Sequence, residues 1–194
     1  MGTGRGKCRP RRKRRLGPVP LRSAAAAMVP FYRAVASSER YARRWSGAIV
    51  RADLKRLEKL LKLVSPLAAK QGLGTNGIGY FISFPADEFD ALLTNGTTIP
   101  PGTVRFTFQT RVHRSIARAV LPFYRKLAAS RSYAAALAKA IRLGDNREVA
   151  GLVRSLIPTP ALKSVAIEDC GIAMLFQYSS SRYPYRNLLV YEML

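Results

Sequence analysis

The sequence repeats itself at a fixed offset of 92 residues. Between positions 22 and 66, 17 of 45 residues are identical to the residue 92 positions later, with no gap. The most specific match is Pro-Phe-Tyr-Arg, which occupies 30–33 and again 122–125. Alanine inflates the count, but this tetrapeptide does not recur through composition alone. Because one unit of this size cannot bury its apolar face by itself, we expect two copies packed around a shared core with approximate two-fold symmetry.

The repeat extends beyond the segments that match best. Three further identities at the same offset are Gly79 with Gly171, Phe84 with Phe176, and Asn95 with Asn187. We therefore assign the copies to about 22–97 and 114–189, within a single folded domain that spans 22–194.

Each copy begins with helical patterns. Apolar or small residues from Val35 to Ile49 recur at helical spacing. Asp53 is then placed as the N-cap of a second helix, whose leucines from Leu54 onward lie on one face and which ends before Pro66. The second copy has Asp145 at the corresponding position, followed three residues later by a glutamate, as in a capping box.

The period changes to two behind each helix pair, which is typical of strands. The expected strands are 78–84, 104–109, 165–167, 172–178 and 188–193, with a tight turn at 169–171. Helices grouped between clusters of strands favour an α+β fold, in which the two pseudo-symmetric repeats share an antiparallel sheet covered by helices.

The chain is strongly basic, with 33 Lys and Arg against 11 Asp and Glu and a formal charge of +22. Nine of the basic residues precede position 23, among glycines and prolines, so we expect residues 1–21 to form a flexible arm. This arm could bind phosphate, serve as a targeting peptide or bind anionic lipid, or it could precede a true start at Met28. Residues 23–194 keep a charge of +13.

Two basic helix faces are the candidate binding residues. The first is the polar face opposite the leucines, where lysines fall at i, i+4 and i+7, and the second leads into the second copy. The residues are Lys55, Arg56, Lys59 and Lys62, and then Arg111, Arg114 and Arg118. Two such stripes on a basic folded domain are typical of a surface that contacts a polyanion.

The sequence offers no catalytic constellation, and we expect no cofactor and no metal site. Gly72 to Gly77 matches Gly-x-Gly-x-x-Gly, but a helix precedes it and a strand follows, so a turn is favoured over a dinucleotide site. Asn76-Gly77 and Asn95-Gly96 are both typical turn dipeptides. His113 lies between arginines, which favours a polar helix face over a catalytic role. The acids Asp87, Glu88 and Asp90 favour a solvated loop.

These observations predict a non-enzymatic protein that binds RNA or DNA through phosphate contacts, without reading the base sequence. The alternative is a structural or assembly protein whose basic face meets an acidic partner or an anionic membrane surface. No stretch is apolar and long enough to span a bilayer, and two cysteines are too few for a disulfide framework, so a cytoplasmic location is expected.

Overall fold

The structure, a computed structural model, describes residues 16–86, 91–100, 102 and 106–193. Within this part of the chain it contains seven helices and six strands. In chain order they are α1 (Pro18–Ser37), α2 (Glu39–Val50), α3 (Leu54–Val64), α4 (Pro66–Ala69), β1 (Gly72–Thr75), β2 (Gly79–Pro85), β3 (Ala91–Thr98), α5 (Thr110–Ala129), α6 (Arg131–Leu143), α7 (Asn146–Arg154), β4 (Leu162–Glu168), β5 (Gly171–Phe176) and β6 (Tyr185–Met193).

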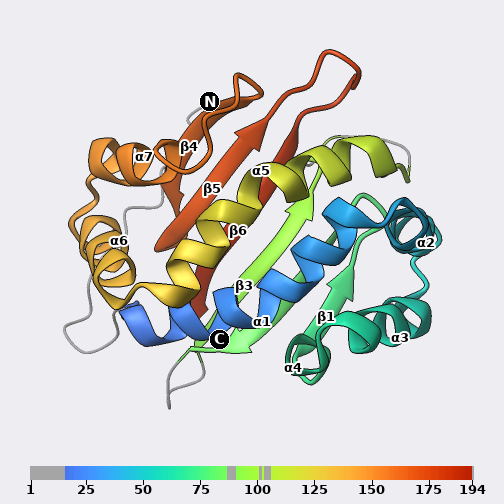
Figure 1. Cartoon of the computed structure of the whole chain (residues 1–194), viewed down its shortest axis with the longest axis horizontal. Helices are drawn as coiled ribbons and strands as arrows, with labels where there is room; N and C mark the ends of the chain where they lie inside the picture. The colour runs from blue at the N-terminus through green and yellow to red at the C-terminus, as the bar shows by residue number, and fades with distance from the viewer. Residues whose placement is uncertain (1–15, 87–90, 101, 103–105, 194) are drawn as a thin grey trace.

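All six strands form one antiparallel sheet in the order β1-β2-β3-β6-β5-β4. β3 and β6 are therefore the central pair, although almost a hundred residues separate them in the sequence. Figure 1 shows α1 and α5 side by side across one face of this sheet, with α2, α3 and α4 beyond one end and α6 and α7 beyond the other. The expected α+β class, with helices over an antiparallel sheet, is confirmed.

The folded part begins earlier than the sequence predicts. Helix α1 starts at Pro18, and both Leu16 and Leu21 are buried, so residues 16–21 belong to the folded domain and not to an arm. Proline suits the first helical turn because its missing N–H would have no partner there. The rest of the expected arm lies outside the described residues. A chain that began at Met28 would lack the first half of α1.

The helical pattern at 35–49 comprises parts of two helices. Helix α1 ends at Ser37, and the Ser38 hydroxyl accepts a hydrogen bond from the Tyr41 amide at 3.2 Å, which caps α2. The two predicted aspartate caps are confirmed: Asp53 accepts from the Arg56 amide at 3.0 Å and Asp145 from the Glu148 amide at 2.9 Å.

Strand prediction fails between residues 91 and 109. The central strand β3 was not expected, and residues 106–109 form no strand, while 104 and 105 lie outside the described residues. Phe106 is 66% exposed, so it does not pack as a strand residue would. The Gln109 amide donates to the Tyr185 hydroxyl at 2.8 Å and not to a neighbouring strand, and the chain then enters α5.

One predicted turn is confirmed and the other is wrong. Gly77 has a φ of 78° between β1 and β2, where glycine has no steric cost, so the glycine-rich segment is a strand and turn. Asn95-Gly96, by contrast, lies in the middle of β3. A Cβ on Gly96 would come within 2.2 Å of the Tyr80 carbonyl oxygen, so this glycine permits close backbone approach, not reversal.

Candidate nucleic-acid interface

Helix α3 presents the first predicted basic face. Leu57, Leu60 and Leu61 are buried against the rest of the helix layer, and the four basic residues on the other side are all exposed. These are Lys55, Arg56, Lys59 and Lys62. Leu54, which we expected on the apolar face, is 40% exposed. At 1.5 Å rise per residue, the lysines extend over about 10 Å of helix.

None of the four α3 cations forms an ion pair with a described residue. The ion pairs of the described chain join Arg43 and Arg114 to Glu39, and Arg186 to Glu168. The acid nearest in sequence, Glu58, is exposed on α3 itself, while Asp53 is engaged at the N-cap. Among the described residues, therefore, no acid neutralises the α3 cations through an ion pair.

The corresponding helix of the second half, α7, uses its polar residues internally. Arg154 donates to the carbonyl oxygens of Leu162 and Lys163, both at 3.1 Å, and the Asn146 side chain accepts from the Ile167 amide at 2.9 Å. These bonds satisfy backbone groups along β4, an edge strand. The offset of 92 aligns Lys62 with Arg154, but of the two only Arg154 hydrogen-bonds to the edge of the sheet.

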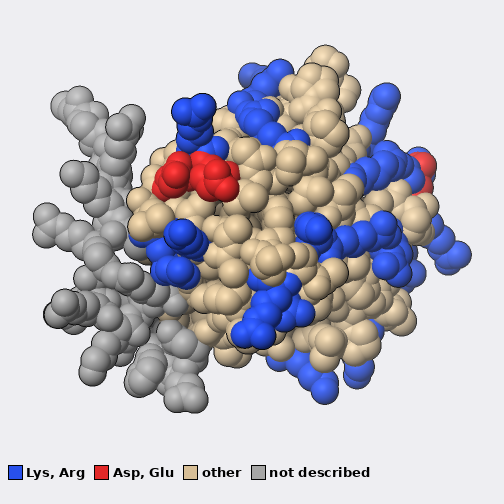
Figure 2. Space-filling model, turned by 60° about the vertical axis from the view of Figure 1, so that its left-hand side comes forward, with Lys and Arg blue, Asp and Glu red and all other residues tan. Residues whose placement is uncertain are grey.

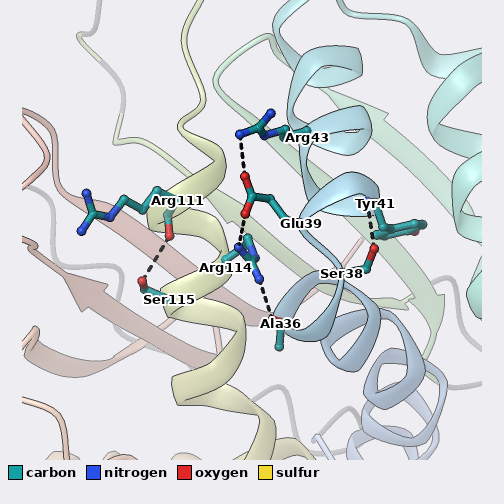
Figure 3. A network of polar contacts seen from close by, with 8 residues as sticks. All are labelled: Ala36, Ser38, Glu39, Tyr41, Arg43, Arg111, Arg114 and Ser115. Carbon is teal, nitrogen blue, oxygen red and sulfur yellow. Dashed lines mark hydrogen bonds and ion pairs between the residues drawn. The ribbon is translucent and has the colours of Figure 1, made fainter.

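The second predicted face, on α5, contains two exposed arginines and a third that bonds within the protein. Arg111 and Arg118 are exposed, but the Arg114 side chain is only 19% exposed. Figure 3 shows Arg114 directed at the end of α1 and the start of α2, where it donates to Glu39 at 3.1 Å and to the Ala36 carbonyl oxygen at 3.4 Å. Glu39 is also paired with Arg43 at 2.6 Å. Arg114 therefore fastens helices together and is not free for phosphate.

The two basic faces lie on separate helices, and the helix between them exposes three further arginines, Arg40, Arg43 and Arg44. Helix α2 contacts both α3 and α5 and lies between them (Figure 1). Basic residues also occur elsewhere: Figure 2 shows Lys and Arg spread widely over the α6–α7 end of the molecule, with few acids. The structure thus sets α3 apart as the denser of the two faces.

A buried polar network at the centre of the molecule is the feature that sequence reasoning missed. Four side chains close a ring of hydrogen bonds between the helix pair and the central strands. Tyr32 donates to Asn95 (2.8 Å), Asn95 to Tyr124 (2.6 Å), Tyr124 to Asn187 (2.8 Å) and Asn187 to Tyr32 (2.8 Å). All four are fully buried, so no substrate reaches them. The sequence did contain a signal for this network, because the offset of 92 aligns Tyr32 with Tyr124 and Asn95 with Asn187.

His113 is buried and not on a polar helix face as predicted. It lies on the inner side of α5 with Val112 and Ile116, and its Nε2 is 3.2 Å from the Tyr80 hydroxyl. Desolvation lowers the pKa of His113 to about 3, and burial raises the pKa of Tyr80 well above its usual value. Both groups are neutral near pH 7, so they form no acid–base pair there.

Other sequence candidates add no chemistry to this surface. Asp87, Glu88 and Asp90 lie outside the described residues. No group of three His, Cys, Asp or Glu side chains suited to a metal occurs in the part of the chain that the structure describes. Among the described helices, none combines the length and apolar character needed to cross a membrane. No protein-family model, curated protein or solved structure matches this chain.

Proposed function

We propose that this protein binds nucleic acid, RNA or DNA, through phosphate contacts made by α3. Lysine and arginine attract phosphate by releasing condensed counterions, and this requires charge and access but no base recognition. Arg111 and Arg118 contribute from α5, while Arg114 does not. Catalysis is not part of the proposal.

The observation that carries the proposal is the unpaired state of Lys55, Arg56, Lys59 and Lys62 among the described residues. A row of like charges on one helix destabilises that helix slightly, and no described acid forms an ion pair with these cations. The related helix α7 carries Glu148 and Gly151 where α3 has Arg56 and Lys59. The charge on α3 is therefore not a requirement of the fold, which favours a binding role.

The experiment is a titration of the full chain with a fluorescently labelled single-stranded RNA at several salt concentrations. Reversing all four α3 charges to Glu should weaken binding and reduce the slope of log affinity against log salt by up to about 3, since each phosphate contact contributes about 0.7. The matched control reverses four other exposed cations, Arg40, Arg44, Arg131 and Lys139, with the same change in net charge. Equal effects of the two variants would refute a role specific to α3.

We also propose that the fold arose from two pseudo-symmetric repeats. Hydrogen bonds that recur at the offset of 92 residues support this origin. Arg22 donates to the Ala128 carbonyl oxygen and Arg114 to that of Ala36. Likewise, the Tyr41 hydroxyl donates to the Leu60 carbonyl oxygen, and the Tyr133 hydroxyl donates to the Leu152 carbonyl oxygen. In this account the two copies keep the packing, and α3 alone acquired the binding face.

A further inference from the structure

Two exposed leucines lie beside the α3 lysines. Leu63 is 73% exposed and Leu67 is 63% exposed. Leu63 follows Lys59 by one helical turn, so the two side chains share a face of α3. We call Lys59, Lys62, Leu63, Leu67 and Lys70 the α3–α4 surface. Single exposed leucines are ordinary on protein surfaces, but here two exposed leucines lie within eight residues of the cations Lys59, Lys62 and Lys70 in the sequence.

The corner between α3 and α4 holds the leucines in fixed positions. Ser65 is buried, and its hydroxyl donates to the Ala27 carbonyl oxygen at 2.6 Å while accepting from the Ala68 amide at 3.3 Å. Leu63 and Leu67 flank this serine. They therefore project from an anchored corner at the outer margin of the helix layer, where Figure 1 shows α3 and α4.

The second half of the chain shows that the fold does not need this surface. At the offset of 92, Leu54, Leu63 and Leu67 are aligned with the polar residues Asn146, Ser155 and Thr159. The charge differs as well. Residues 53–70 contain five Lys or Arg and two acids, a balance of +3, whereas residues 145–162 contain two of each and are neutral.

The combination of cations and exposed leucines fits one kind of partner. Phosphate groups of a nucleic acid account for lysines but leave the leucines in water. A bilayer with anionic headgroups satisfies both, because lysine stems let the charge stay at the headgroups while apolar side chains enter the boundary with the acyl chains. Each cation near such a surface strengthens association about fivefold.

We infer that the α3–α4 surface docks on anionic phospholipid membranes, with Leu63 and Leu67 entering the interface. This goes beyond the proposed binding of nucleic acid and does not depend on it. The two ligands share the lysines and would compete for them, but only the membrane uses the leucines.

The test is co-sedimentation of the full chain with vesicles of phosphatidylcholine containing one third phosphatidylserine, and with pure phosphatidylcholine vesicles. We expect binding only to the anionic vesicles. Replacing both leucines by their second-half counterparts, L63S with L67T, should weaken vesicle binding about tenfold and leave RNA binding unchanged. The matched control is L143S, since Leu143 is 71% exposed but lies on α6.

The outcomes separate this inference from the proposed function. Failure of the unaltered chain to bind anionic vesicles would overturn it, whatever the RNA result. So would equal vesicle binding by the leucine variant and by L143S. If the leucine variant loses RNA binding as well, the leucines serve a shared or structural role, and the membrane assignment is wrong. Loss of vesicle binding alone supports it.

Discussion

Acidification should destabilise this protein through one side chain, His113. It is the only histidine in the chain, and it is fully buried against Phe31, Tyr80 and Phe108. Burial lowers its pKa from 6.5 to about 3. The folded state therefore keeps the ring neutral at pH values where the unfolded chain has already bound a proton.

The sign and the size of the effect follow from this difference. Stability is at its full value above pH 6.5 and falls as the pH drops through 6.5 towards 3, because the unfolded state binds more protons in that window. Each unit of pKa difference corresponds to about 1.4 kcal/mol. The loss in unfolding free energy should reach about 2 kcal/mol between about pH 7.5 and 5, and about 4 kcal/mol near pH 3.

Urea denaturation at several pH values above 5 measures this loss before most carboxylates titrate. The variant His113→Gln retains a polar group for the Tyr80 hydroxyl but cannot ionise, so its stability should vary far less with pH, whatever its absolute value. In the folded wild type, the NMR signal of the ring should not titrate between pH 7.5 and 5. A titrating ring, or equal pH dependence in both proteins, would refute the reasoning.

Further predictions concern matched positions in the two halves. Tyr41→Phe and Tyr133→Phe each remove one hydroxyl bond to a carbonyl oxygen, so each should lower the unfolding free energy by about 1 kcal/mol in urea denaturation; a large inequality would count against equivalent roles. Ala52 has a φ of 51° where the second half has Gly144 with a φ of 69°, so Ala52→Gly should raise the melting temperature and Gly144→Ala should lower it, each by about 1 kcal/mol in stability. Asn95→Ala breaks the buried ring and leaves Tyr32 without its acceptor, and should cost about 3 kcal/mol; a loss below 1 kcal/mol would show that the ring is dispensable.

Local signals predicted several outer parts of the fold, although the edge strand β1 was not expected. The aspartate caps, the leucine face of α3 and the alternation in β2, β4 and β5 depend on residues within a few positions of one another. The turn at 169–171 was predicted from sequence as well, and Asp169 and Cys170 adopt the positive φ values of a tight hairpin turn.

The centre of the fold could not be predicted in this way. β3 contains Thr94-Asn95-Gly96-Thr97, which lacks apolar alternation and has at its centre Asn and Gly, two residues that are depleted in strands. Asn95 is held in the strand by Tyr32, Tyr124 and the Leu188 carbonyl oxygen, at separations from 29 to 93 residues. A turn dipeptide becomes a central strand because tertiary hydrogen bonds override its local preference.

The candidate site was predictable only in part. Periodicity placed the α3 cations on an exposed face, and the structure agrees. The same reasoning grouped Arg114 with Arg111 and Arg118, although Glu39, its partner 75 residues away, removes it from the surface. Helical spacing alone does not indicate which cation meets an acid from another element.

The most direct test of the account is the salt dependence of RNA binding by the full chain and by the variant with all four α3 charges reversed. We predict tight binding that weakens steeply with salt for the full chain, and a weaker, flatter response for the variant. Identical titrations would show that α3 contributes nothing and that its charge serves another purpose.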